Sequence, residues 1–212
     1  MLELERLTGR GLIPVVVIDD VAQAVPLGEA LVEAGLPVAE VTLRTPAALG
    51  AIERMAAVEN LLVGAGTVLN ADQAKRAIDA GARFVISPGL DEAVVQCCHD
   101  RDIPAAPGIA TATEAQRAVG LGLELVKFFP AEAIGGAALL KALAAPFAGL
   151  RFIPTGGVSA SNLTDYLSLP SVAACGGSWM VRREWLRDGQ WDRVKESVRD
   201  AVAIASETLA AK

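Results

Sequence analysis

The sequence predicts an α/β protein, a (βα)8 (TIM) barrel with a short N-terminal helix, and three observations carry this prediction. Eight short apolar runs recur along the 212 residues, each of the length of a strand. Their starts lie about 20 to 30 residues apart, which suits a strand, a helix and two short loops and is too long for a hairpin. The runs are continuously apolar rather than alternating, as parallel strands covered on both faces should be.

The expected elements alternate along the whole chain. The apolar runs expected to form strands are 13–18, 38–43, 61–65, 84–86, 103–106, 123–129, 152–154 and 172–175. Helices are expected before, between and after them, at 1–9, 21–33, from 46 onward, 71–80, 92–99, 113–119, 136–143, 161–167 and 192–208. The segment between the last strand and the last helix is expected to be a polar connection.

The alternative architecture is a doubly wound open sheet. Such a sheet normally has fewer βα units, and no GxGxxG motif follows the first expected strand. The number of units therefore favours the barrel, whose usual lower size limit is about 200 residues. No linker, low-complexity segment or shift in composition divides the sequence, so residues 1–212 are expected to form one domain.

Composition and charge argue against several classes of function. Hydrophobic residues make up 52% of the chain and aromatic residues only 4%, so a large aliphatic core is expected. The formal net charge of −6 argues against binding to nucleic acid or to anionic membrane surfaces. The longest uncharged run, 166–181, contains Pro170 and two glycines and is too short to span a membrane.

The sequence predicts no metal, no cofactor and a reducing, cytoplasmic compartment. The single histidine, His99, cannot supply a His-based zinc site, and no CxxC spacing occurs. Three cysteines, of which Cys97 and Cys98 are adjacent, make a poor disulfide framework. The first ten residues are charged throughout, which does not fit a signal peptide.

The residue that points most directly to chemistry is Lys127. It is the only one of the five lysines that falls within an expected strand, where Val126 precedes it and two phenylalanines follow it. Burial of a lysine disfavours the charged ammonium and leaves the neutral, nucleophilic amine that Schiff-base enzymes need. The alternative is a lysine whose stem is buried while its ammonium reaches solvent at the rim.

A carboxylate and a guanidinium are expected on one face of another strand. Side chains alternate along a strand, so Glu40, Thr42 and Arg44 share a face that points into the barrel. Glu40 is the candidate for proton transfer, and Arg44 suits a substrate carboxylate, which a guanidinium binds through two hydrogen bonds. A mutual salt bridge between Glu40 and Arg44 is the structural alternative. Thr67, which follows the third expected strand, offers a hydroxyl at the mouth.

Two glycine pairs accompany the ends of the last two expected strands. Gly156-Gly157 follows Thr155, and Gly176-Gly177 precedes Ser178. In barrels this position commonly binds phosphate through backbone N–H groups and a helix N-terminus. Tight βα loops also need glycine for purely structural reasons.

Together these residues predict retro-aldol cleavage of a phosphorylated 2-keto acid. A neutral Lys127 attacks the ketone and forms an iminium, which serves as the electron sink. Glu40 moves the protons, while Arg44 and Thr67 hold the carboxylate beside the ketone. The glycine loops hold the phosphate at the other end of the substrate.

Six strings spread along nearly the whole chain share the pattern of one known family. In chain order they are Glu40-Val-Thr-Leu-Arg-Thr45, Gly64-Ala-Gly-Thr-Val-Leu-Asn70, Ser87-Pro-Gly89, Val126-Lys-Phe-Phe-Pro-Ala-Glu132, Pro154-Thr-Gly-Gly157 and Gly176-Gly-Ser-Trp179. With these strings the sequence resembles the 2-keto-3-deoxy-6-phosphogluconate aldolases, also called bifunctional 4-hydroxy-2-oxoglutarate aldolases. Two nearby positions, Ile134 and Ala110, depart from the residues that the family often has there.

The resemblance implies a class I aldolase that yields pyruvate and glyceraldehyde 3-phosphate in the Entner–Doudoroff pathway. It also implies a homotrimer of (βα)8 barrels. Lys127 matches the Schiff-base lysine and Glu40 the proton-transfer glutamate, while Arg44 and Thr67 match contacts of the pyruvate carboxylate. The remaining matched positions are Pro88 and Phe129 in the pyruvyl pocket, and Thr155, Gly156, Gly157, Gly177 and Ser178 around the distal hydroxyls and phosphate.

Two other functions share parts of this pattern. A phosphosugar isomerase or epimerase on the same barrel would use the phosphate loops but needs no buried lysine. A non-catalytic barrel that binds a phosphorylated metabolite would keep the glycine loops and tolerate loss of Glu40. Covalent trapping of a ketone on Lys127 separates the aldolase from both.

Overall fold

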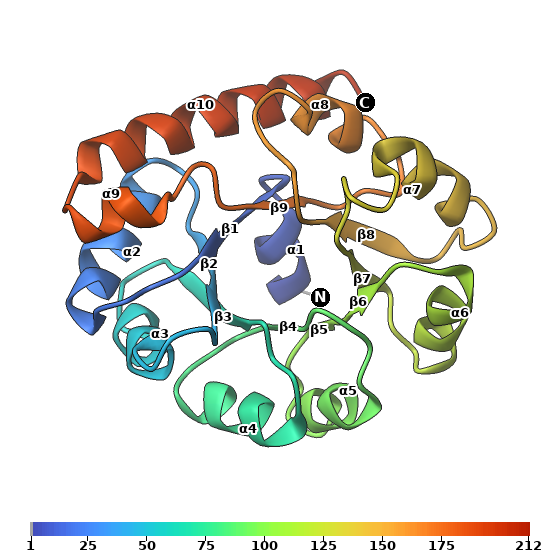
Figure 1. Ribbon diagram of the computed structural model, residues 1–212, viewed down its shortest axis with the longest axis horizontal. Coiled ribbons are helices and arrows are strands. Elements are labelled where there is room, and N and C mark those ends of the chain that lie inside the picture. Colours follow the sequence, from blue (N-terminus) through green and yellow to red (C-terminus); the bar gives the residue numbers. More distant parts are fainter. Residues whose placement is uncertain (1) are drawn as a thin grey trace.

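The computed structural model describes residues 2–212 and shows parallel strands surrounded by helices (Figure 1). A six-stranded sheet has the order β5-β4-β3-β2-β1-β9, and a three-stranded sheet has the order β6-β7-β8. All paired strands of the two sheets run parallel. The strands are β1 (Leu12–Val16), β2 (Val38–Thr42), β3 (Leu62–Gly66), β4 (Val85–Ile86), β5 (Ala105–Ala106), β6 (Gly108–Ile109), β7 (Leu125–Phe128), β8 (Arg151–Pro154) and β9 (Cys175–Gly177).

Most helices lie outside the strands and connect each one to the next (Figure 1). Polar side chains begin several of them: Asn70, Asp91 and Thr111 each accept a hydrogen bond from the backbone N–H three residues later. The helices are α1 (Leu2–Thr8), η1 (Val21–Gln23), α2 (Ala24–Glu33), α3 (Ala48–Ala56), α4 (Ala71–Asp79), α5 (Glu92–His99), α6 (Ala112–Gly120), α7 (Gly136–Ala144), α8 (Leu163–Leu167), α9 (Arg183–Arg187) and α10 (Trp191–Ala210).

The expected N-terminal helix is present as α1, with Met1 outside the described residues. Its Leu7 is buried in the core. Leu4 and Thr8 line a small pocket with Leu125 and Arg151, the first residues of β7 and β8. Helix α1 therefore lies at the amino ends of the strands, and the carboxyl ends remain for a functional site.

Three sequence expectations are wrong in detail. The expected strand 103–106 is reduced to β5, and an unexpected short strand, β6, follows Pro107, which lacks the N–H group that would continue the ladder. Gly176 and Gly177, expected in a loop, belong to β9, where Gly177 pairs with Pro14 of β1. The polar connection before the last helix contains α9, whose Leu186 is buried and anchors it to the core.

The two sheets meet at two places along the chain. On one side only Pro107 separates β5 from β6, and its carbonyl accepts a hydrogen bond from the N–H of Lys127 in β7. On the other side, isolated parallel bridges pair Phe152 with Val172 and Thr155 with Gly176, which brings β8 beside β9.

The core is aliphatic with a few large aromatic anchors, as the composition predicts. Phe84, Phe128, Phe152 and Tyr166 are all buried almost completely. Among residues 2–212, no helix is long and apolar enough to cross a bilayer. Within the same range, no cluster of three or more His, Cys, Asp or Glu side chains could hold a metal ion.

Gly64 of β3 supports the ring of Phe84, and a substitution there should destabilise the fold. A Cβ atom at Gly64 would lie 2.4 Å from the nearest atom of that ring. We expect Gly64→Ala to lower the free energy of unfolding by about 1–3 kcal/mol, because the ring must move within a close-packed core. Urea unfolding followed by circular dichroism measures this change.

The matched control for Gly64→Ala is Gly120→Ala at the end of α6. A Cβ atom at Gly120 would meet nothing within 4 Å, and alanine favours a helix over glycine. We expect Gly120→Ala to be neutral or slightly stabilising. Equal unfolding free energies for the two variants would show that Phe84 does not constrain position 64.

Candidate active site

A cavity of about 400 Å³ opens at the carboxyl ends of the strands. Seven strands, β1 to β4 and β7 to β9, contribute to its wall directly or through the loops that follow them. The lining residues are Val15, Glu40, Thr42, Arg44, Thr67, Pro88, Lys127, Phe129, Thr155, Gly156, Gly157, Val158, Gly176, Gly177 and Ser178. The structure thus brings every site residue predicted from the sequence to one cavity.

Lys127 lies inside the cavity and does not reach solvent. It sits on β7 between Gly108 of β6 and Ile153 of β8, and its side chain is only 6% exposed. Its Nζ lies 3.5 Å from Oε1 of Glu40 and 5.0 Å from the centroid of the Phe129 ring. A lysine that extends its ammonium to the rim is therefore not what the structure shows.

Glu40 is the most deeply buried polar residue of the site. It lies in the middle of β2, with its side chain 1% exposed. Neither carboxylate oxygen accepts a hydrogen bond of good geometry from the described residues, so the ammonium of Lys127 is its ion-pair partner. Burial raises the pKa of the Glu40 carboxyl, and the charge of Lys127 opposes that rise.

Gly66 of β3 makes room for the Glu40 carboxylate. A Cβ atom at Gly66 would lie 2.1 Å from Oε1 of Glu40, which is shorter than any tolerable contact. The Gly-Ala-Gly string of the third strand therefore shapes the acid's position. In the sequence this glycine could be recognised as a site of close approach, but the partner that approaches it could not.

The sequence argument that placed Arg44 on a strand face is wrong. Strand β2 ends at Thr42, and Arg44 lies in the turn that follows, where its N–H donates to the carbonyl of Thr42. Arg44 still lines the cavity and is exposed to solvent on its other side.

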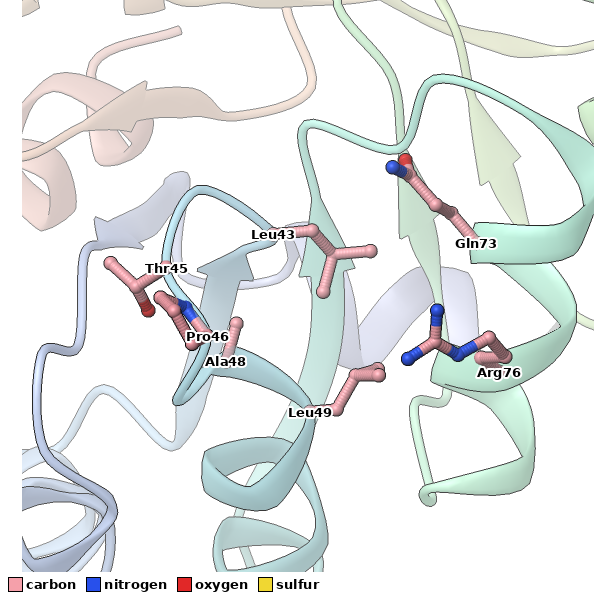
Figure 2. A pocket seen from close by; sticks show the side chains of 7 residues that line it. All are labelled: Leu43, Thr45, Pro46, Ala48, Leu49, Gln73 and Arg76. Carbon is pink, nitrogen blue, oxygen red and sulfur yellow. The ribbon is translucent and has the colours of Figure 1, made fainter.

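The residue before Arg44 points the other way. A separate pocket of about 180 Å³ lies on the outer side of this turn. Figure 2 shows Leu43, just after β2, among the side chains that line it. Leu49 of α3 and Arg76 of α4 line the same pocket (Figure 2). Burial of Leu43 on that side leaves Arg44 facing the cavity.

Thr67, at the end of β3, has an unusual backbone. Its φ of 56° lies in the left-handed region, which a β-branched residue rarely adopts. The residue is partly buried, and its neighbour Val68 is anchored by a hydrogen bond to the carbonyl of Ile86. Strain of this kind persists where surrounding structure enforces it, and often marks a functional site.

Glycines dominate the wall formed at the ends of β8 and β9. Gly156 and Gly157 form a loop after β8 with φ values of 96° and 85°, a conformation that favours glycine. Gly176 lies against Thr155, because a Cβ atom there would be 2.3 Å from the threonine Oγ1. Ser178, directly after β9, is exposed at the rim. This wall offers backbone groups and hydroxyls without a carboxylate.

Three cavity residues were not assigned to the site from the sequence: Val15, Thr42 and Val158. A fourth, Gly176, was expected there only as a member of its glycine pair. Thr42 was the easiest to find, since it lies between Glu40 and Arg44 in the alternation of β2. Its Oγ1 donates a hydrogen bond to the carbonyl of Val16, at 2.9 Å. Val15 and Val158 gave no signal, because an apolar residue at a strand end is indistinguishable from core.

The geometry brings an amine, a carboxylate, a guanidinium and a glycine loop to one cavity. The amine of Lys127 and the carboxylate of Glu40 share a nearly dry interior, where proton transfer between them and a bound molecule is short-range. Arg44 supplies a positive charge at one side of the opening, and the glycine loop supplies backbone N–H groups at the other.

Comparisons with known proteins point to one family. A family model described as KDPG and KHG aldolase matches residues 4–197. A 2-dehydro-3-deoxy-phosphogluconate aldolase of Treponema pallidum is 48% identical over 201 residues, which cover 93% of this chain and 91% of that relative.

Solved structures agree with these sequence matches. The KDPG aldolase of Legionella pneumophila, with pyruvate captured at low pH as a covalent carbinolamine intermediate, has a TM-score of 0.89 and 40% identity, covering 93% of this chain and 96% of that one. The 2-keto-3-deoxy-6-phosphogluconate aldolase of Zymomonas mobilis ZM4, with 3-phosphoglycerate, has a TM-score of 0.87 and 42% identity, covering 95% and 94%. The resemblance found in the sequence strings is confirmed, and the chain belongs to the KDPG and KHG aldolase family.

Proposed function

We propose that this protein is a class I aldolase that cleaves 2-keto-3-deoxy-6-phosphogluconate to pyruvate and glyceraldehyde 3-phosphate, the aldol cleavage of the Entner–Doudoroff pathway. The observation that carries the proposal is the buried amine of Lys127, 3.5 Å from the carboxylate of Glu40 inside the cavity. Membership of the KDPG and KHG aldolase family supports it, and also supports activity on 4-hydroxy-2-oxoglutarate.

The reaction begins at the ketone carbon of the substrate. The neutral amine of Lys127 adds to this carbon to give a carbinolamine, which loses water and becomes an iminium. Glu40 then accepts the proton of the C4 hydroxyl as the C3–C4 bond breaks. The bonding electrons pass to the iminium nitrogen, the aldehyde leaves, and an enamine of pyruvate remains on the lysine.

Release of pyruvate reverses the first steps. The proton held by Glu40 is returned to C3 of the enamine, which restores an iminium of pyruvate. Water adds to that iminium, and the lysine amine departs as pyruvate forms. A carboxyl whose pKa is raised by burial can both accept and return a proton in this cycle.

The remaining lining residues orient the substrate. Arg44 and Thr67 hold the carboxylate beside the ketone, and Pro88 and Phe129 enclose the three carbons that become pyruvate. The opposite wall holds the hydroxyls and the phosphate, through Thr155, Gly156, Gly157, Gly177 and Ser178. The backbone N–H groups of the glycine loop suit a phosphate dianion.

The wider organisation proposed for the protein follows the family resemblance. The two sheets form one closed (βα)8 barrel, which is supported by the bridges between β8 and β9 and by the short break at Pro107. Residues 1–212 act as one domain that assembles as a homotrimer in the cytoplasm, consistent with three free cysteines. Sedimentation equilibrium tests the trimer, and a monomer at working concentration would contradict it.

Borohydride reduction in the presence of pyruvate should attach pyruvate permanently to Lys127. The iminium is reducible, so peptide mapping by mass spectrometry should find the adduct on this residue alone. Lys127→Ala should give no adduct and lose activity by roughly 10³-fold or more. Lys141→Ala, an exposed lysine on α7, serves as control.

The adduct experiment also separates the competing functions. An isomerase, an epimerase or a non-catalytic binding protein forms no iminium with pyruvate. An adduct at another lysine, or full activity in Lys127→Ala, would disprove the assignment of the nucleophile.

Glu40 should set the acidic limb of the pH–rate profile. Its pKa is raised by burial, and only the carboxylate form accepts a proton, so activity should fall as pH drops through a value above 4.5. Glu40→Gln should still form the iminium with pyruvate but turn over about 10²–10⁴-fold more slowly. The same acidic limb in Glu40→Gln would mean that another group controls it.

Arg44 should govern affinity for the substrate carboxylate. Loss of a charge-assisted hydrogen bond costs about 1.5–3 kcal/mol, so Arg44→Ala should raise KM for both substrates by roughly 10- to 150-fold. Arg76→Ala removes a guanidinium from the outer pocket of Figure 2 and should leave KM unchanged. Equal KM values in the two variants would show that Arg44 does not bind the substrate carboxylate.

A further inference from the structure

A hydrogen bond between two residues outside the cavity supports the glycine loop after β8. Tyr166, in α8, is completely buried, and its hydroxyl donates to Oε1 of Glu132. Glu132 closes the string that begins at Val126 and contains Lys127, yet neither Glu132 nor Tyr166 lines the cavity. The proposed chemistry leaves this pair without a role.

The backbone around Glu132 is fastened to the loop. The N–H of Ala131 donates to the carbonyl of Thr155 at 2.8 Å, and the N–H of Glu132 donates to the carbonyl of Gly156 at 3.0 Å. These two bonds continue the pairing of β7 with β8 beyond the ends of both strands. Backbone hydrogen bonds therefore tie the segment after Lys127 to the start of the loop Gly156–Val158.

The side chain of Glu132 also covers the loop from outside. A Cβ atom at Gly157 would lie 2.5 Å from both Cβ and Cγ of Glu132, so the carboxylate's stem rests directly on this glycine. On Gly156, the Phe129 ring takes the corresponding place, 3.3 Å from a Cβ atom built there. The loop is thus held between Phe129 and Glu132, and glycine's conformational freedom is restricted by what packs on it.

Charge gives the Tyr166 bond a second consequence. Glu132 is exposed, and the stem that carries its carboxylate rests on Gly157, in the loop to which the phosphate is assigned. A carboxylate that swings toward a phosphate repels it. Burial and the bond to Glu132 raise the pKa of Tyr166, so the phenol remains a donor that keeps the carboxylate directed at α8.

We propose that Glu132 and Tyr166 are positioning residues for the loop Gly156–Val158, and that their hydrogen bond gives the enzyme its preference for phosphorylated over non-phosphorylated 2-keto acids. The inference rests on the proposed function, since it assigns the substrate's phosphate to this loop. The pair acts through the loop's backbone and never touches the reacting atoms.

The test compares two substrates in three variants. Tyr166→Phe removes the donor, Glu132→Ala removes the acceptor and the stem, and Glu132→Gln keeps an acceptor without the charge. We expect the first two to raise KM for 2-keto-3-deoxy-6-phosphogluconate roughly tenfold, as loss of a hydrogen bond to a charged group implies. For the same two variants, kcat on the phosphorylated substrate should stay within about twofold of the parent value. Their kcat/KM for 4-hydroxy-2-oxoglutarate should also stay within about twofold.

Two controls make the result specific. Glu132→Gln should restore KM for the phosphorylated substrate to within about twofold, because its amide oxygen still accepts from Tyr166. Thr208→Val deletes another buried hydroxyl, which donates a hydrogen bond to the carbonyl of Ile204 and lies near Thr164 of α8. This variant should leave KM and kcat/KM unchanged for both substrates. If Tyr166→Phe fails to fold, Glu132→Ala at an exposed position still provides the comparison.

Each outcome separates this inference from the proposed function. An equal loss of kcat/KM on both substrates would mean that the pair only supports the fold. Unchanged KM values in Tyr166→Phe and Glu132→Ala would show that the pair does not position the loop. Either result leaves the parent an active aldolase. A parent protein that cleaves neither substrate and forms no adduct with pyruvate overturns the proposed function, and this inference with it.

Discussion

The buried pair of Lys127 and Glu40 is the constraint on which the rest of the site depends. Removing a carboxylate and an amine from water costs several kcal/mol, and a single contact of 3.5 Å offsets only part of that cost. The surrounding fold must therefore supply the difference through its aliphatic core. The oxygens of Glu40 accept no hydrogen bond of good geometry from the described residues, so the ion pair with Lys127 is the polar contact that the structure gives them. In the proposed mechanism, the same burial that is unfavourable for folding prepares the pair for proton transfer.

The two halves of this pair come from different sheets. Lys127 belongs to the three-stranded sheet and Glu40 to the six-stranded sheet, so their distance is set by how the sheets meet. That meeting depends on small features: the break at Pro107 and the bridge from Thr155 to Gly176. The cavity is consequently a property of the whole strand arrangement, and no local motif could create it.

The periodicity of the apolar runs predicted the parallel α/β organisation. The polar residues and glycines at the strand ends predicted the site residues that line the cavity. What the sequence could not supply were the exact ends of strands. Arg44 lies beyond the end of β2, and its direction is set by Leu43 entering the pocket between α3 and α4. The strand expected at 103–106 ended before Pro107, and nothing in the pattern indicated that pairing resumes beyond it as β6. Such details depend on tertiary contacts, which a single strand's pattern does not contain.

Gly66 shows where this protein can and cannot change. Any side chain at position 66 would displace Glu40, so random mutagenesis should recover glycine almost exclusively there among active clones. Ser178, at the rim, is exposed. Libraries that aim to alter the aldehyde partner should therefore diversify the rim and hold β3 fixed. The evolvable part of the active site is the part that does not carry the buried acid.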